Sequence, residues 1–368
     1  MLTRLYIDNY RSFVNFEFRP GPLCLVLGEN GAGKSSLFDV MECLRDFISG
    51  DVSIKIFNSN TLTRWQSRPQ QSFEIELSVH GDVYTYKLLV EHNLQLGLRR
   101  VQQESLFLNE KPLYTSQGAK AQLYRDDHSK GPEIPADWSR SGVGFLHAGT
   151  DNTRLGKFRE VIKRMTIVGL NPMTMSGTSD GACTKLGHHG DNFASWYQAM
   201  MLESPIVVSN LTVALRELFP QFSELSLLES GDKRVLKARF SPPHNMKKSE
   251  YKPYSFNELS DGQRCLIVLY TLFYVAKEKS LLLFLDEPDN YVAMREIQPW
   301  LALLEELCGD TDSEAQVVIA SHNSEVVNYL DASRSIVLER HDGWATRTKP
   351  LSVVDGLSPA ETLARGWE

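Results

Sequence analysis

The sequence contains few cysteines, and their spacing fits neither a set of disulfides nor a metal site. Five are present in 368 residues and none forms a CxxC pair: Cys24, Cys43, Cys183, Cys265 and Cys308. Neither a disulfide framework nor a zinc finger is indicated. An odd number of scattered thiols is typical of a reducing compartment, so a cytoplasmic location is expected.

Long hydrophobic runs are missing as well. The longest extends from Cys265 to Ala276 and is interrupted by Thr271, which is well short of the about 20 apolar residues that cross a bilayer. The first residues are charged and alternating, so they do not predict a signal peptide. A membrane partner is therefore not expected.

An excess of positive charge is absent too. The 39 Lys and Arg face 46 Asp and Glu, a net charge of -7, which argues against a protein that coats nucleic acid. Two basic stretches leave DNA or RNA open as a ligand. They are the helical pattern around Arg154, Lys157, Lys163 and Arg164, and the polar loop 244–252. A solvated surface is the simpler interpretation of both.

The spacing of apolar residues predicts a mixed chain with no internal repeat and no heptads. Alternating residues predict strands within 2–18, within a meander over about 60–125 that turns at Asn109-Glu110, and within 225–241. Helical spacing predicts helices over 35–47, 152–165, 193–202 and 209–219. Residues 126–152 are rich in Asp, Ser, Gly and Pro and are predicted to be a loop.

The stretch "GENGAGKSS", residues 28–36, fits the pattern GxxxxGK[ST]. It follows the apolar run "LCLVL" and precedes a helical pattern, which is the context in which this motif binds phosphate. Backbone angles that point N–H groups at phosphate oxygens are open to its three glycines, Gly28, Gly31 and Gly33. Lys34 supplies a positive charge, Ser35 a hydroxyl for Mg²⁺, and the helix start a favourable dipole.

Two further apolar runs end in polar residues. "LLLFLDE", residues 281–287, predicts a buried strand that ends at Asp286. A carboxylate at the C-terminal edge of a parallel sheet is suited to hold Mg²⁺, and Glu287 beside it is placed to orient or deprotonate water. "VVIASHN" predicts another strand, with His322 at its end to position water or sense a phosphate. Taken alone, the first run is more simply interpreted as a strand that ends in two solvated acids, and the second as a strand that ends in a structural histidine.

The stretch "NELSDGQR", residues 257–264, opens another apolar helical pattern. Ser260 is a suitable helix N-cap residue. Its hydroxyl, the flexible Gly262 and the helix start together make an anion cap. A chain with a phosphate loop at 28–36 has no evident need of a second one for the same nucleotide.

Taken together, "GENGAGKS", "LSDGQR", "LLLFLDEP" and "IASH" resemble the ABC-type ATPase head, in the branch shared by SMC, RecF and OLD-family proteins. The resemblance covers about 1–60 and 250–345. It implies an α/β fold class, a P-loop ATPase head with a mixed β core, an antiparallel β meander and an inserted helical lobe. The implied domains are a first ATPase lobe over 1–150, a helical insertion over 151–255 and the rest of the ATPase core over 256–368.

The resemblance implies ATP and Mg²⁺ as cofactors and a head-to-head homodimer, or a larger even-numbered oligomer, closed around ATP. In such heads the signature loop caps the nucleotide of the other subunit, so 257–264 would act in trans. Catalysis would fall to Glu287 and His322, and the metal to Ser35 and Asp286. The implied nucleotide-binding residues are Arg11, Gly28, Asn30, Gly31, Gly33, Lys34, Ser35, Ser36, Ser260, Gly262 and Gln263.

The chain departs from the family pattern at two places. Asp261 replaces a glycine of LSGGQ and puts a carboxylate near a bound anion, which should weaken the cap unless Arg264 or a cation of the partner compensates. The family's glutamine between the lobes has no counterpart near 145–152, where His147 is the candidate substitute. Asp289-Asn290 falls where the family's dimer-contacting loop lies.

Longer stretches such as "LDEPDNYVAMREIQPWL" and "LSPAETLARGWE" resemble stand-alone ATPases of bacterial anti-phage operons, with Septu-type ATPases as relatives in logic. This implies a sensor or switch for a separate nuclease or toxin effector. Too few residues follow His322 for the nuclease domain of OLD-family proteins, so an effector is expected on another polypeptide. The alternative is a RecF-like or SMC-like ATPase of DNA repair or recombination without a toxin. A transporter subunit is disfavoured by the β meander.

The stretch "CTKLGHHGDN" offers a different chemistry through Cys183, His188, His189 and Asp191. Their spacing fits no structural zinc finger, and a polar loop is the simpler interpretation. No Ser-His-Asp or Cys-His arrangement indicates nucleophilic catalysis.

Overall fold

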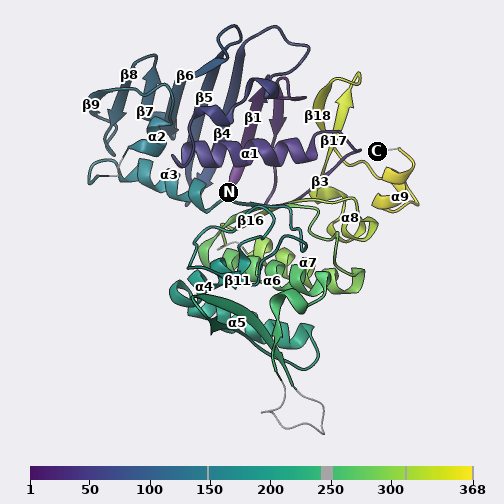
Figure 1. The fold of residues 1–368 in the computed structure, drawn as a ribbon. Helices are drawn as coiled ribbons and strands as arrows, with labels where there is room; N and C mark the ends of the chain where they lie inside the picture. Colours follow the sequence, from purple (N-terminus) through teal and green to yellow (C-terminus); the bar gives the residue numbers. More distant parts are fainter. Residues whose placement is uncertain (147–148, 242–251, 311–312, 367–368) are drawn as a thin grey trace. The chain divides into compact units, whose positions relative to one another are not determined.

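The computed structural model describes residues 1–146, 149–241, 252–310 and 313–366. The chain divides into two compact units (Figure 1). Unit 1 consists of Met1–Met165 together with Asp331–Glu368, and unit 2 consists of Thr166–Leu330. Unit 1 is therefore built from both ends of the sequence, and each unit has its own sheets and helices.

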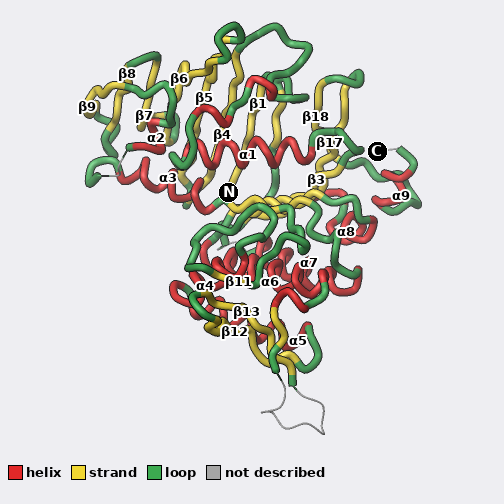
Figure 2. Tube along the Cα trace, viewed as in Figure 1, coloured by secondary structure: helices red, strands yellow, loops and turns green. Residues whose placement is uncertain are grey.

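Unit 1 contains an eight-stranded antiparallel sheet (Figure 2). The strand order is β2-β1-β4-β5-β6-β7-β8-β9. The strands are β1 Leu2–Asp8, β2 Phe16–Phe18, β4 Gln70–Val79, β5 Asp82–Asn93, β6 Leu98–Leu108, β7 Lys111–Gln117, β8 Lys120–Tyr124 and β9 Lys130–Pro135. The two strands predicted within 2–18 and the meander predicted from about 60 are confirmed, and with them the mixed α/β fold class.

Alternation of apolar residues is what defines the long strands of this sheet. In β4, Phe73, Ile75 and Leu77 are fully buried and the residues between them are partly exposed, as expected for side chains with a period of two. Asn109 and Glu110 connect β6 to β7 with φ of 47° and 67°. These values suit a two-residue hairpin turn whose twist matches its strands, and the predicted turn is confirmed.

The prediction of a loop over 126–152 is wrong in part. This stretch contains strand β9, which pairs with β8, and the short helix α2, Gly142–Phe145. β9 has no buried residue and contains two prolines, so its side chains carry no strand signal. It forms because β8 offers it a backbone ladder at the edge of the sheet, where proline is tolerated.

Helices α1, Lys34–Ile48, and α3, Thr153–Arg164, belong to unit 1 and pack against the sheet (Figure 1). Phe47 of α1 contacts Phe57, and Phe57 contacts Phe73 of β4, with ring centroids 5.4 Å and 5.1 Å apart. Phe158 of α3 stacks on Tyr86 of β5 at 5.8 Å. The helix predicted over 152–165 buries one apolar stripe, which consists of Leu155, Phe158, Ile162 and Met165.

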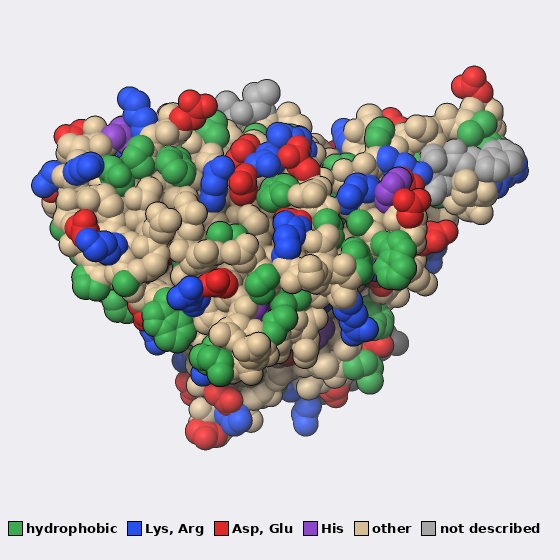
Figure 3. Space-filling view, turned by 90° about the horizontal axis from the view of Figure 1, so that it is seen from above, with side chains coloured by type: hydrophobic (Ala, Val, Ile, Leu, Met, Phe, Trp, Pro, Cys, Tyr) green, Lys and Arg blue, Asp and Glu red, His purple; other side chains and the backbone are tan. Residues whose placement is uncertain are grey.

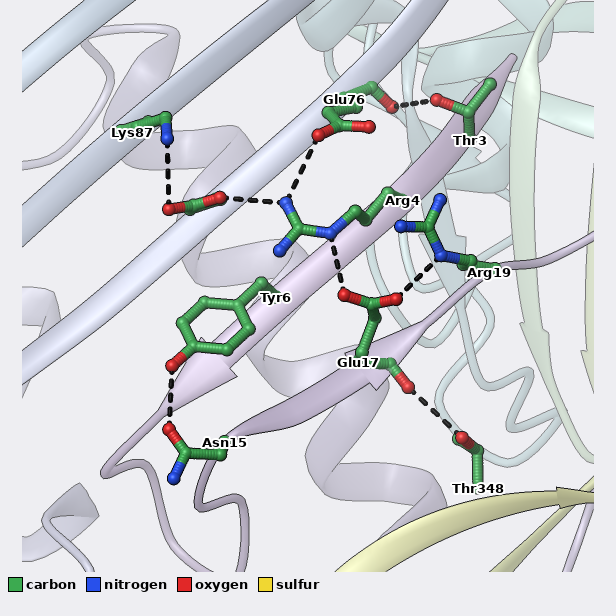
Figure 4. A network of polar contacts seen from close by, with 10 residues as sticks. Thr3, Arg4, Tyr6, Asn15, Glu17, Arg19, Glu76, Lys87 and Thr348 are labelled. Atoms are coloured by element: carbon green, nitrogen blue, oxygen red, sulfur yellow. Dashed lines mark hydrogen bonds and ion pairs between the residues drawn. The ribbon is translucent and has the colours of Figure 1, made fainter.

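A charged network joins four strands of the same sheet (Figure 4). Arg4 of β1 donates to Glu17 of β2 at 2.8 Å and to Glu74 and Glu76 of β4 at 2.8 Å and 3.2 Å. Lys87 of β5 pairs with Glu74 at 3.3 Å. Only 16% of the Arg4 side chain is exposed, so these ion pairs are less screened by water than pairs at an open surface.

A second polar cluster is buried where the meander meets α2. Glu104 of β6 is 0% exposed and accepts hydrogen bonds from the Tyr86 hydroxyl at 2.9 Å, the Ser141 hydroxyl and the Gly142 amide at 2.7 Å. Ser141 also caps α2 by accepting from the Gly144 amide at 3.0 Å. Burial raises the pKa of the Glu104 carboxyl above its ordinary value, although the hydrogen bonds that it accepts act in the opposite direction.

A separate group of strands in unit 1 combines the N-terminal and C-terminal parts of the chain. β3, Leu23–Leu27, pairs in parallel with β17, Ser335–His341, and β17 pairs antiparallel with β18, Ala345–Pro350. Every residue of β3 is buried, as expected of a strand covered on both faces. Helix α9, Pro359–Ala364, follows. The strand that precedes the phosphate loop is thus held by a strand more than 300 residues later.

Unit 2 contains three parallel strands and five α-helices among the residues described. The strands are β10 Thr166–Val168, β15 Leu282–Asp286 and β16 Gln316–Ala320, with β15 between the other two. The helices are α4 Phe193–Glu203, α5 Pro205–Leu218, α6 Asp261–Lys279, α7 Met294–Gly309 and α8 Ser324–Leu330. The helices predicted within 193–219 are confirmed.

A small antiparallel sheet completes unit 2. Its strands are β11 Thr178–Ser179, β12 Phe222–Ser230, β13 Lys233–Phe240 and β14 Tyr254–Ser255. The hairpin predicted within 225–241 is therefore confirmed. Most of the basic loop 244–252 lies outside the described residues.

Candidate functional site

The predicted phosphate loop connects β3 to α1 in unit 1. Its three glycines all have positive φ, 143° at Gly28, 82° at Gly31 and 116° at Gly33. A side chain at Gly28 would place its Cβ 2.3 Å from the carbonyl oxygen of Leu338 in β17. Glycine is therefore required at position 28 both by the backbone angle and by the close approach of β17.

Side chains from the C-terminal part of unit 1 hold this loop from outside. Arg340 of β17 donates to the Gly31 carbonyl at 2.9 Å, and the Thr346 hydroxyl of β18 donates to the Ala32 carbonyl at 2.8 Å. In a planar trans peptide the N–H points away from the carbonyl before it. Fixing the Ala32 carbonyl on the β18 side therefore turns the Gly33 amide to the opposite side.

The start of α1 fits an anion. Its N-cap residue, Gly33, has no side chain with which to bond the first amides, and its first turn contains no acid. The amides at a helix start and the helix dipole then favour a negative ligand. Lys34 is buried, and its ammonium group donates to the carbonyls of Gly28 and Glu29 at 2.6 Å and 3.1 Å. Ser35 is exposed, so its hydroxyl is available to a ligand.

The structure brings the predicted Arg11 to the same helix. Arg11 donates from one guanidinium nitrogen to the Ser36 hydroxyl at 3.1 Å and to Asp39. Its backbone has φ of 49°, in the left-handed region that non-glycine residues seldom occupy. The contact with Ser36 places Arg11 beside the loop 28–36.

The acidic strand end lies in unit 2. Asp286 is the last residue of β15, and Glu287 follows with φ of 48°. His322 follows β16, and its Nε2 lies 3.6 Å from Oε1 of Glu287. The other carboxylate oxygen, Oε2, accepts a hydrogen bond from Asn290 at 2.6 Å. The predicted pair Glu287 and His322 is therefore brought together at the C-terminal ends of two neighbouring parallel strands.

A buried carboxylate connects the two strand-end loops. Asp289 is 7% exposed, and burial raises the pKa of its carboxyl, although hydrogen bonds with Ser321 and Asn323 act to lower that pKa. Ser321 and Asn323 flank His322 in the sequence. The loop after β15 and the loop after β16 are thus tied by polar contacts on both sides of His322.

The predicted signature loop begins α6 in unit 2. Ser260 is the N-cap residue, and its hydroxyl accepts from the Gln263 amide at 3.3 Å while the Gln263 side chain accepts from the Ser260 amide at 3.0 Å. This reciprocal pair is a capping box. A Cβ at Gly262 would lie 2.9 Å from the carbonyl oxygen of Tyr291, so the signature loop packs closely on the loop after β15.

Asp261 has a partner of opposite charge. Its carboxylate pairs with the Arg264 guanidinium, which is 12% exposed and also donates to the Pro172 carbonyl at 2.6 Å. The carboxylate lies in the first turn of α6, where it is favoured by the helix dipole. Arg264 therefore offsets the negative charge of Asp261, which is one of the two kinds of compensation that the sequence suggested.

Some residues near these loops belong to no recognisable sequence motif. Arg340 and Thr346 hold the phosphate loop but lie in strands without a distinctive pattern. His188 was assigned to a polar loop, yet it lies close to Asp286: a Cβ at Gly169 would be 3.3 Å from Nε2 of His188 and 3.5 Å from Cβ of Asp286. Chain connectivity gives no hint of either contact.

Other predicted features are less defined. Within the described residues, no group of three or more His, Cys, Asp or Glu side chains is arranged to hold a metal ion. Ser35 and Asp286 supply hydroxyl and carboxylate oxygens, the donors that Mg²⁺ prefers. His147 lies outside the described residues. In the part of the chain that the structure describes, no helix is both long and apolar enough to cross a bilayer.

The basic helix predicted around Arg154 is α3, in which Lys157, Lys163 and Arg164 are exposed. Figure 3 shows Lys and Arg side chains interspersed with Asp and Glu over the face that it presents. An interspersed surface suits a solvated protein of net negative charge.

Comparison with known protein families gives two matches along the chain. Residues 4–133 match the family described as "AAA domain", and residues 178–328 match "AAA domain, putative AbiEii toxin, Type IV TA system". Both stretches match AAA domains. The first contains the phosphate loop, and the second contains the signature loop and both strand-end loops.

No curated protein matches the chain. Among solved structures, one similar chain comes from work described as "Structural biochemistry of ATP-driven dimerization and DNA stimulated activation of SMC ATPases". It is 16% identical, with a TM-score of 0.33, and the match covers 46% of this chain and 92% of that chain. A match this partial defines neither the fold nor the function.

Proposed function

We propose that the chain is an ATPase that binds ATP through the phosphate loop and hydrolyses it with the residues of the strand-end loops. The observation that carries the proposal is the pairing of Glu287 with His322, in a chain that also has a phosphate loop at the uncapped start of α1. The AAA-domain matches over both stretches support it.

In this proposal each group acts on one part of the substrate. The glycine-rich loop and the start of α1 bind the phosphates through amide N–H groups. Lys34 exchanges its carbonyl contacts for phosphate oxygens. Mg²⁺ would be held by Ser35 and Asp286 and would neutralise charge on the transferred phosphoryl group. Asn290 fixes one carboxylate oxygen of Glu287, and the other, which lies 3.6 Å from Nε2 of His322, would accept a proton from water.

The first test is Lys34→Ala. Hydrogen bonds to charged groups contribute about 1.5–3 kcal/mol each, so we expect ATP affinity to fall roughly tenfold to a hundredfold, because about 1.4 kcal/mol corresponds to tenfold. Isothermal titration with a non-hydrolysable ATP analogue measures this. Lys120→Ala, a surface lysine of the same unit, should keep the parent's affinity. Equal affinity of Lys34→Ala and the parent chain would remove the phosphate loop from the proposal.

We also propose that two copies close head to head around ATP, with the signature loop of one copy capping the nucleotide of the other. Ser260, Gly262 and Gln263 stand at the start of a 19-residue helix, where an anion is favoured. The capping box occupies the Ser260 and Gln263 side chains within one copy, so these groups would exchange partners on closure.

Asp261→Asn tests this capping. Removing the carboxylate takes away an Arg264 pair and a favourable dipole contact, so we expect the free energy of unfolding to fall by up to about 1 kcal/mol. The same change removes a negative charge from the anion cap, so ATP-dependent self-association should strengthen. Urea denaturation measures the first effect and light scattering with an ATP analogue the second. Weaker association than in the parent chain would contradict the capping role.

We propose further that the ATPase acts in bacterial anti-phage defence, as a sensor or switch for a separate effector such as a nuclease or toxin. The second matching family is described as containing a putative toxin of a toxin–antitoxin system, which supports this setting. Coexpression with the protein encoded next to it, followed by copurification with and without ATP, tests the partnership. ATPase stimulation by DNA without any protein partner would favour the alternative, a DNA repair or recombination ATPase.

A further inference from the structure

Two exposed tryptophans from distant parts of the sequence meet in unit 1. The rings of Trp65 and Trp344 lie edge to face, with centroids 5.4 Å apart and an interplanar angle of 65°. Their exposed fractions are 40% and 60%. In an edge-to-face pair one ring meets its partner with its edge, so the pair itself covers neither face of that ring. The two rings therefore form an open aromatic surface and are not part of the buried core.

Trp344 belongs to the hairpin that holds the phosphate loop. It lies in the turn between β17 and β18, and its carbonyl accepts a hydrogen bond from Arg340 at 2.6 Å. Another nitrogen of the same guanidinium donates to the Gly31 carbonyl at 2.9 Å. The Thr346 amide, two residues after the tryptophan, donates to the Ser12 carbonyl at 2.9 Å. The backbone of Trp344 is therefore one guanidinium group away from the phosphate loop.

Trp65 is tied to the segment that contains Arg11. The Thr63 amide donates to the side-chain oxygen of Asn9 at 3.1 Å, and this hydrogen bond is buried. The Arg11 amide donates to the Thr61 carbonyl. Because Trp65 follows these residues closely in the sequence, its backbone is held beside residues 9–11.

Residues 9–12 thus join the tryptophan pair to the start of α1. They are hydrogen-bonded both to β18 and to residues 61–63. The Arg11 guanidinium donates to the Ser36 hydroxyl at 3.1 Å in the first turn of α1, where helix amides bind phosphate. Phosphates bound there leave the ribose and the base of a nucleotide outside the loop. The same contacts bring the two open rings close to that position.

We infer that Trp65 and Trp344 form a platform on which the base of the bound nucleotide stacks. The inference rests on the proposed ATPase function and adds a base-binding part to the same site. Aromatic side chains stack on any nucleobase, because every base has a π face. The platform therefore favours a nucleotide over inorganic phosphate and does not by itself distinguish adenine from guanine.

The test compares a ligand that has a base with one that lacks it. The full chain is titrated calorimetrically with a non-hydrolysable ATP analogue and with inorganic tripolyphosphate, both with Mg²⁺. Trp65→Ala and Trp344→Ala are each expected to weaken binding of the analogue about tenfold to a hundredfold, because base stacking is lost. Their affinity for tripolyphosphate should stay that of the parent chain. Trp138→Ala removes another exposed tryptophan of unit 1 and is the matched control, with both affinities unchanged.

The outcomes separate this inference from the proposed function. If both alanine variants bind the analogue like the parent chain while Lys34→Ala binds it more weakly, the platform is overturned and the ATPase proposal stands. If Trp65→Ala weakens both ligands equally, the platform is also overturned, because the pair then only supports the loop. If the parent chain binds neither ligand, the ATPase proposal itself fails. Trp65→Phe guards against a folding defect, since it keeps an aromatic face, and it should recover most of the affinity for the analogue.

Discussion

The Glu287→Gln variant is expected to hydrolyse ATP at least about a hundredfold more slowly than the parent chain, because a positioned general base contributes 10²–10⁴-fold. Glutamine keeps the size of the side chain and the contact with Asn290 but cannot accept a proton from water. Binding should persist, since the phosphate loop is untouched. Phosphate release under saturating ATP measures turnover, and titration with ATP measures binding.

Trapped ATP should also hold two copies together. We expect the Glu287→Gln variant to sediment as a dimer with ATP and as a monomer without it, because hydrolysis no longer opens the closed form. Glu305→Gln, an acid of α7, provides the matched control and should behave like the parent chain. Normal turnover in Glu287→Gln together with a monomer in ATP would remove both the catalytic role and the ATP-dependent closure.

Replacing Glu104 by alanine is expected to lower the free energy of unfolding by about 3–5 kcal/mol, because three buried donors lose their acceptor and each unsatisfied donor costs about 1–3 kcal/mol. The change leaves the Tyr86 hydroxyl, the Ser141 hydroxyl and the Gly142 amide without their shared acceptor. Chemical denaturation followed by tryptophan fluorescence measures the loss. A loss below about 1 kcal/mol would show that water enters and satisfies these donors.

The same carboxyl predicts a pH dependence with a definite sign. Burial raises the pKa of Glu104 in the folded chain above its ordinary value of 4.5, so the folded state holds a proton that the unfolded state releases. Its contribution to stability is complete below pH 4.5 and is lost as the pH rises to the folded pKa. In Glu104→Gln this loss should disappear, and a parent chain that gains stability from this group over the same range would contradict it.

Local signals explain what the sequence predicts well. The phosphate loop is recognisable from residues 28–36 alone, because its glycines, its lysine and the flanking strand and helix are adjacent. The cap formed by Ser260 and Gln263 is equally local, as both partners fall within one helical turn. Apolar alternation predicted the meander for the same reason, since neighbouring residues alone decide which face is buried.

Contacts between distant residues explain what the sequence does not predict. Strand β9 is specified by its neighbour β8 rather than by its own exposed side chains. His188 approaches Asp286 only because β10 pairs with β15 and Gly169 leaves space between them. No spacing along the chain encodes these approaches.

The hydrogen bonds from Arg340 and Thr346 to the phosphate loop have a consequence for protein synthesis. Arg340 donates to a carbonyl 309 positions earlier in the chain, and Thr346 donates to one that is 314 positions earlier. A ribosome therefore releases the loop long before the residues that shape it have been translated. Nascent chains that end ahead of β17 should be unable to capture nucleotide, however well their upstream sheet has already folded, so that ligand uptake becomes one of the last events in the maturation of the polypeptide.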